Sequence, residues 1–167
     1  MTHFNPSPPN PTQLRSLYEE VILEHNRHPR HYPENPPGCN HHAHGFNPLC
    51  SDEIDLHLKV VDGVIQDVGF EGAGCAVAMA SASMLTEAVL GKPVAEARAL
   101  FARVHAMLAE DGTPQGVGKL QVLAGVKEFP MRVKCASLPW HTLIAALDQR
   151  QETVTTEDDV ALCPQPE

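Results

Sequence analysis

The stretch EIDLHLKVVDGVIQDVGF, residues 53–70, decides the fold of this chain. From Ile54 to Val60, apolar and polar residues alternate, which is typical of a strand with one buried face. Asp62-Gly63 then favours a tight hairpin turn, and a largely apolar return strand follows over residues 64–71. The sequence therefore predicts two antiparallel strands joined by a short turn.

Helical patterns surround this hairpin. Apolar residues recur at helical spacing from Thr12 until shortly before Pro29, and a short extended piece is expected over residues 43–49. After the hairpin, helices are expected up to Gly91, from Pro93 onward, around residues 119–124 and, following Cys135, at the end of the domain. We expect an α+β fold, with a small three-stranded antiparallel sheet and helices on one of its faces.

The length of 167 residues suits one domain with its own core. We expect that domain over residues 12–148. A flexible Pro-rich tail is expected over residues 1–11, and an acidic flexible tail over residues 149–167.

Composition excludes several kinds of partner. The net charge is -9, from 21 acidic and 12 basic residues, which disfavours nucleic acid and anionic membranes. No apolar run approaches the length of a membrane span, and the N-terminus lacks the features of a secretory signal. We expect a cytoplasmic protein.

The cysteines offer the clearest chemistry. They stand at positions 39, 50, 75, 135 and 163, with no C-x-x-C pair, so any shared site must be assembled by the fold. Cys50, Cys75 and Cys135 each lie where one expected element meets the next. The start of the helix after Cys75 should lower the pKa of that thiol, and the bases Arg132 and Lys134 should lower that of Cys135.

Together with Asp52, these three thiols would form a four-donor site suited to zinc or to an iron-sulfur species. The alternative is that the cysteines are small buried hydrophobic or turn residues, because free cysteine is among the most buried residue types. Spacing alone leaves both interpretations open.

Three motifs in order resemble the U-type iron-sulfur assembly proteins, the IscU and SufU group: NPLCSD, FEGAGCAVAMASASMLTEAVLGK and GVKEFPMRVKCASLPWHTL. The resemblance runs from about Leu17 to Leu147. The long gap between the second and third motif cysteines is more similar to SufU than to IscU. So is Lys134, where IscU has histidine.

The resemblance implies that Cys50, Asp52, Cys75 and Cys135 bind zinc. A SufS-like cysteine desulfurase would pass sulfane sulfur to Cys50, freed when the desulfurase offers the zinc a histidine, and Arg132 would assist. Downstream cluster assembly machinery would then receive the sulfur. In an IscU-like protein the same ligands would instead hold a transient 2Fe-2S cluster on a scaffold that is not an enzyme. A structural zinc domain is a third alternative.

Other features fall outside that pattern. Ser51 replaces the usual glycine of the family, so a positive φ at this position would carry a steric cost. Cys39 and Cys163 match no motif and are interpreted as surface thiols. The run that contains His41, His42 and His44 is either a metal-binding tract or, more commonly, a solvated loop that collects metal adventitiously.

Overall fold

A computed structural model describes residues 11–109 and 116–155 of the chain. Its core is the hairpin of β2 (Asp52–Val61) and β3 (Val64–Ala73), and β1 (His41–Asn47) pairs antiparallel with the other edge of β2. The turn residues Asp62 and Gly63 have φ values of 52° and 76°, as a tight hairpin turn requires. The predicted hairpin is confirmed.

The sheet differs from the expected one in its number of strands and in their direction. A fourth strand, β4 (Val154–Thr155), lies parallel to β1, so the order is β3-β2-β1-β4 and the sheet is mixed. The expectation of three antiparallel strands is therefore wrong. The reason is that the chain returns past the end of the last helix to the free edge of β1, where two residues suffice to cap that edge.

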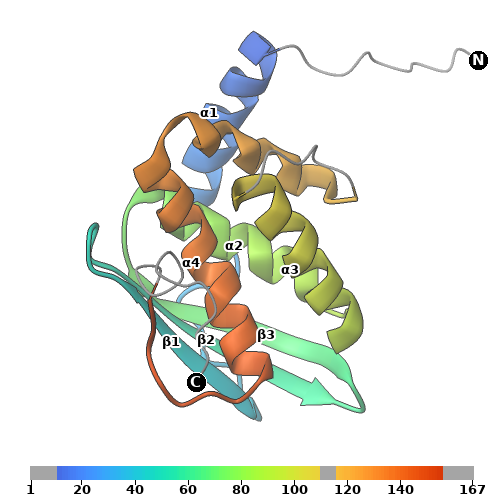
Figure 1. The fold of residues 1–167 in the computed structure, drawn as a ribbon. Coiled ribbons are helices and arrows are strands. Elements are labelled where there is room, and N and C mark those ends of the chain that lie inside the picture. The colour runs from blue at the N-terminus through green and yellow to red at the C-terminus, as the bar shows by residue number, and fades with distance from the viewer. Residues whose placement is uncertain (1–10, 110–115, 156–167) are drawn as a thin grey trace, which may run out of the picture.

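The helices cover one face of this sheet, as expected (Figure 1). They are α1 (Pro11–Arg27), α2 (Ala76–Val89), α3 (Val94–Ala109), the 3-10 helix η1 (Gly118–Glu128) and α4 (Pro130–Leu147). α4 contacts β1 and β2, and α2 contacts both α1 and α4. The apolar face of β2, with Ile54, Leu56 and Leu58, is fully buried under these helices.

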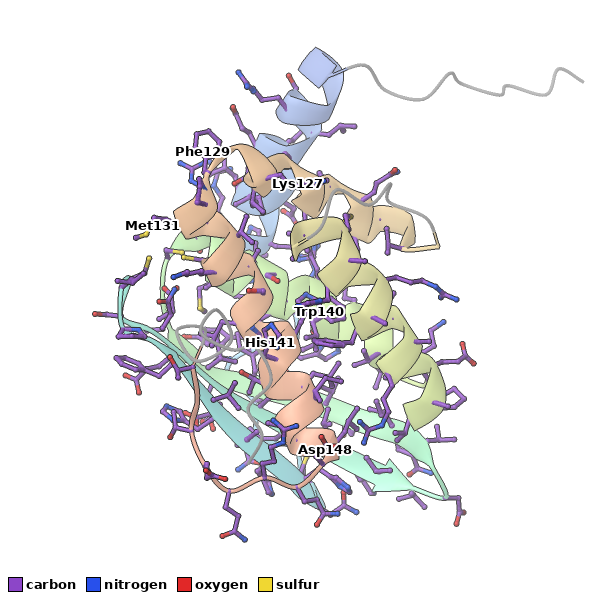
Figure 2. The ribbon with its side chains drawn as sticks, in the orientation of Figure 1. Lys127, Phe129, Met131, Trp140, His141 and Asp148 are labelled. Atoms are coloured by element: carbon purple, nitrogen blue, oxygen red, sulfur yellow. The ribbon has the colours of Figure 1, made fainter. Side chains whose placement is uncertain are left out.

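A polar link joins the two central helices within this core. Trp140 of α4, which Figure 2 labels in the interior, donates its indole N–H to Ser81 Oγ of α2 over 3.1 Å. Ser81 in turn donates to the carbonyl oxygen of Ala136 over 2.6 Å. Both ends of the link are buried, so the hydrogen bonds fix how α2 and α4 lie against each other.

The last helix begins earlier than the sequence indicated. Pro130 occupies its first turn, where a missing N–H group is tolerated, and Pro139 lies inside it. Cys135 is therefore a residue of α4, not a residue that precedes it. Within residues 11–109 and 116–155, no helix combines the length and apolar character that a membrane crossing needs.

Candidate metal centre

Three potential ligands meet at one end of the sheet. The ligand atoms of Cys50, Asp52 and Cys135 all lie within 4.8 Å of one another, and the two sulfur atoms are 3.3 Å apart. Cys50 lies in the turn between β1 and β2, Asp52 is the first residue of β2, and Cys135 lies in α4. The fold thus brings together residues separated by 85 positions.

Asp52 is fully buried and held in place by hydrogen bonds. Its Oδ1 accepts the backbone N–H of Cys75 over 2.8 Å, and its Oδ2 lies 3.4 Å from the amide nitrogen of Asn47. Both donors are neutral, so a bound cation would offset the charge of this carboxylate. The site therefore has the chemistry of a metal centre.

Cys75 stands beside this group. It is the N-cap residue of α2, and its Sγ lies 3.9 Å from Asp52 Oδ2 and accepts the backbone N–H of Ala78. The predicted strand-to-helix junction is confirmed. A small movement of this side chain would add a fourth donor to the Cys50, Asp52 and Cys135 group.

The thiols differ in how readily they ionise. A hydrogen bond with the Cys135 thiol lowers the pKa of Cys75 to about 7, and the N–H of Ala78 acts in the same direction against the effect of burial. The same hydrogen bond with Cys75, together with burial, raises the pKa of Cys135. In the metal-free protein, Cys75 therefore loses its proton more readily than Cys135.

The expected lowering of the Cys135 pKa by Arg132 and Lys134 is wrong. Neighbouring thiols and burial dominate at Cys135, and they raise its pKa. The Arg132 guanidinium lies over the ring of Phe129, 4.4 Å from its centroid, with one nitrogen 3.5 Å from the Tyr18 hydroxyl. These contacts direct its charge toward α1 and the start of α4.

Ser51 has the backbone conformation that its replacement of glycine suggested. Its φ is 58°, in the left-handed region, and its side chain is exposed. This conformation turns the chain between Cys50 and Asp52, so that one residue lies in the turn and the other begins the strand. A non-glycine residue with positive φ carries a steric cost, and here that residue lies between the two potential ligands Cys50 and Asp52.

Asn47 and Gly74 belong to the site although no sequence pattern singled them out. Asn47 is fully buried, and its amide lies 3.7 Å from Cys135 Sγ while its Oδ1 accepts the N–H of Leu49. A Cβ added at Gly74 would lie 2.6 Å from Asp52 Oδ1. The only available signal was that each residue lies within a motif, Asn47 three positions before Cys50 and Gly74 one position before Cys75.

The remaining sequence candidates lie elsewhere. Cys39 is half-buried in the loop before β1, and burial raises its pKa, so it is less exposed than a surface thiol. Cys163 lies outside the described residues. His41, His42 and His44 lie in β1 and not in a solvated loop.

Comparison with known proteins agrees with the geometry. Residues 17–136 match the family described as NifU-like N terminal domain. The chain is 36% identical over 138 residues to the iron-sulfur cluster assembly scaffold protein IscU of Streptococcus pyogenes, covering 81% of this chain and 86% of the relative. It is 37% identical over 134 residues to the zinc-dependent sulfurtransferase SufU of Bacillus subtilis, covering 78% and 88%.

A solved structure shares the fold as well as the sequence. The crystal structure of FiSufU from Fervidobacterium islandicum AW-1 superposes with a TM-score of 0.71 at 31% identity, over 80% of this chain and 98% of that protein. The family match over residues 17–136 includes Cys50, Cys75 and Cys135. The chain therefore belongs to the NifU N-terminal-like family of iron-sulfur cluster assembly proteins, the group that contains IscU and SufU.

Proposed function

We propose that this protein is a zinc-dependent acceptor of persulfide sulfur from a cysteine desulfurase. Zinc would be held by Cys50, Asp52, Cys75 and Cys135. The observation that carries the proposal is the convergence of two thiol sulfurs and a buried carboxylate within 4.8 Å, with a third thiol adjacent. The relative at 37% identity that is named a zinc-dependent sulfurtransferase supports zinc and sulfur transfer.

The donor set supports zinc on chemical grounds. Thiolate sulfur and carboxylate oxygen both belong to the ligands that zinc takes, and four donors suit its tetrahedral preference. A carboxylate is a harder partner than a thiolate for a soft or borderline metal. Asp52 would therefore complete the site while leaving one position easier to exchange.

Cys50 is the best placed acceptor of sulfur. It lies in a turn between exposed residues, Leu49 and Ser51, whereas Cys135 is almost fully buried in α4. Cys75 is fixed at the start of α2 by the N–H of Ala78. A thiol on a turn can leave a metal and meet a partner with the least disturbance of the fold.

The transfer step requires no outside oxidant. The Cys50 thiolate would attack the terminal sulfur of the desulfurase persulfide, and a new S–S bond would form at Cys50 Sγ. The S–S bond of the donor would break, and its cysteine would leave as a thiolate. Zinc bound at the centre would keep the Cys50 sulfur deprotonated until the exchange.

Exposed apolar side chains near the centre support a protein partner. Leu49 precedes Cys50 and is 51% exposed, and Met131, near the start of α4, is 49% exposed. Figure 2 shows Phe129 and Met131 together at the N-terminal end of α4, on the outside of the molecule. Large apolar side chains gathered beside a reactive thiol are typical of a docking surface.

The test is persulfide formation on the zinc-loaded protein with a SufS-like desulfurase and cysteine. Mass spectrometry should find one added sulfur atom at Cys50, and Cys50→Ala should lose it. Cys39→Ala, which removes a half-buried thiol outside the centre, should keep it. If zinc binds but wild type carries no more sulfur than Cys50→Ala, the centre is structural and the proposal fails.

A second function is favoured by the relatives named scaffold proteins. In that case Cys50, Cys75 and Cys135, with Asp52, would hold a transient 2Fe-2S cluster. Anaerobic reconstitution with iron and sulfide would then give a stable visible spectrum that Cys75→Ala abolishes. Elemental analysis separates the two functions, because zinc without iron supports sulfur transfer and iron with equal sulfide supports the scaffold.

A further inference from the structure

Metal-ligating side chains also gather on the face of the sheet that the helices leave uncovered. His42 pairs directly opposite His57 in the register of β1 and β2, and His44 pairs opposite Asp55. Their side chains point away from the face that carries buried Leu56 and Leu58. The sulfur-transfer proposal assigns no role to this histidine cluster.

The two opposed histidines bring nitrogen atoms together. His42 Nδ1 and His57 Nδ1 are 2.8 Å apart. With metal–nitrogen bonds of about 2.0 Å, ligands at a right angle lie about 2.8 Å apart, and ligands at the tetrahedral angle about 3.3 Å apart. Without a metal this separation is that of a hydrogen bond between the two rings. It is also the spacing of two adjacent ligands of a square-planar or octahedral ion.

A carboxylate orients one of these rings. His57 Nε2 lies 2.8 Å from Glu71 Oε1 on β3, close enough to donate its N–H to that oxygen. In the neutral ring this bond places the proton on Nε2 and leaves the Nδ1 lone pair facing His42. A carboxylate behind the far nitrogen of a ligating histidine is a recurrent feature of protein metal sites.

We propose that His42 and His57 form a second metal site, which takes a divalent late first-row ion of the Ni²⁺ or Cu²⁺ class through their two Nδ1 atoms. Imidazole nitrogen suits these ions, and their square-planar or octahedral geometry suits the nitrogen separation. When His57 Nδ1 offers its lone pair, His42 Nδ1 carries the proton of the bond between the rings. A metal would displace that proton, and the exposed His42 ring can hold it on Nε2 instead. Water completes the coordination.

The surroundings admit and favour a hydrated cation. A hollow of about 410 Å³ opens beside the pair, and its wall includes His44, Asp55 and Arg150. Glu53 and Glu71 belong to the same face of the sheet, and Glu53 lies 3.2 Å from His44 Nε2. On the wall itself Asp55 and Arg150 balance each other in charge, and on the wider face the three carboxylates Glu53, Asp55 and Glu71 outnumber the cations Arg150 and Lys59.

This site is separate from the cysteine centre. Asp52 is the buried first residue of β2, whereas His57 lies on the opposite face of the same strand, five residues further along. That spacing corresponds to roughly 16 Å along an extended strand. A metal held by the histidine pair would therefore share no ligand with Cys50, Asp52 or Cys135.

The test measures Ni²⁺ binding by equilibrium dialysis on the full chain loaded with one equivalent of zinc. His42→Asn and His57→Asn should each lose more than tenfold in affinity, and Glu71→Gln, which keeps both ligands, should lose about tenfold. The matched control is His41→Asn, because His41 is the next residue of the same run but its Nδ1 faces Asn40. It should bind Ni²⁺ within twofold of wild type.

A second protein separates this proposal from the proposed function. The variant Cys50→Ser/Cys135→Ser removes two donors of the cysteine centre and should keep the Ni²⁺ affinity of the histidine pair, whatever that centre binds. Unfolding temperatures of the metal-free histidine variants equal to that of metal-free wild type would show that the variants fold. If His42→Asn and His57→Asn bind Ni²⁺ as wild type does, or if His41→Asn loses as much as they do, only adventitious binding to the run exists.

Discussion

Asn47 shows how one buried side chain can position two potential ligands. Its amide nitrogen faces Asp52 and Cys135, while its oxygen accepts the N–H of Leu49 in the turn that carries Cys50. Asn47→Ala would leave these buried groups without their partner, so the free energy of unfolding should fall by about 1–3 kcal/mol. Zinc affinity, measured by competition with a chromophoric chelator, should fall by about tenfold.

Asn40→Ala is the matched control for that prediction. Asn40 also makes hydrogen bonds through both ends of its amide, to the N–H and carbonyl of Val60, but it is exposed and lies away from the centre. Its loss should leave zinc affinity unchanged. Equal zinc affinity in Asn47→Ala and Asn40→Ala would contradict the role given to Asn47.

Gly74 is required by the close approach of Asp52. In Gly74→Ala the new Cβ would lie 2.6 Å from Asp52 Oδ1, so the carboxylate or the adjoining backbone must shift and the arrangement of the centre changes. Zinc affinity should fall by about tenfold. Gly69→Ala crowds its neighbours equally, with a Cβ 2.6 Å from the carbonyl oxygen of Glu34, and should lower stability without lowering zinc affinity.

At the scale of single residues, the sequence predicted the residues whose side chains can bind a metal. Cys50, Asp52 and Cys135 are identified by type and motif, and the fold brings their ligand atoms within 4.8 Å. The role of Asn47 could not be predicted, because it depends on a contact with a residue 88 positions away. The same holds for Gly74, because the space where a side chain would lie is occupied by the carboxylate of Asp52 in β2.

At the scale of elements, α4 lies directly on β1 where β1 has a glycine. A Cβ at Gly45 would lie 2.1 Å from Thr142 Oγ1, so Gly45→Ala should lower the free energy of unfolding by about 1–3 kcal/mol. In Thr142→Ala the clashing hydroxyl is absent. The double variant should therefore lose less than the two single losses added together, as measured by urea denaturation.

If the losses of unfolding free energy in the two single variants add up to the loss in the double variant, α4 and β1 do not contact each other directly at these residues. The nearest remaining atom to the added Cβ would be Leu138 Cδ1 at 3.1 Å, the end of a side chain that can turn aside. The coupling is thus expected to be large.

The docking of α1 on α2 should depend on pH through His25. This ring is buried with its Nδ1 2.7 Å from Ser83 Oγ, and burial, aided by the charge of Arg30, lowers the pKa of His25 below its usual 6.5. The folded protein thus resists protonation that the unfolded chain accepts. The stabilisation by neutral His25 is complete above about pH 6.5 and is lost as the pH falls through the lower folded pKa.

The measurement is the free energy of unfolding of wild type and His25→Gln between pH 8 and pH 5. The advantage of wild type should shrink below about pH 6.5, since glutamine does not titrate. Parallel curves for the two proteins would contradict the prediction.

Elements with a clear period were predictable, and elements without one were not. β2 and its hairpin follow from alternation and from Asp62-Gly63. β4 has two residues and no period, and its pairing with Gly45 and Phe46 depends on where α4 ends. The early start of α4 was concealed by Pro130 and Pro139, which are helix breakers in most contexts but are accommodated in this helix.

At the scale of the whole molecule, the cysteine centre joins segments that are far apart in sequence. Cys50 comes from the turn between β1 and β2, and Asp52 from the start of β2. Cys75 is the N-cap residue of α2, and Cys135 lies in α4. A metal held by these residues would tie the sheet to both central helices. Because the unfolded chain cannot present the four donors together, binding energy at this centre becomes folding energy.

Zinc removal should therefore destabilise the entire domain and not only the loop around Cys50. With free zinc at a thousandfold excess over its Kd, the free energy of unfolding should exceed that of the chelator-treated protein by about 4 kcal/mol. Thermal unfolding should shift as one cooperative transition. Cys135→Ser removes the donor that joins α4 to the sheet, so it should unfold at the same temperature with and without zinc. Cys39→Ala removes no donor of the centre, so its unfolding temperature should rise with zinc as that of wild type does.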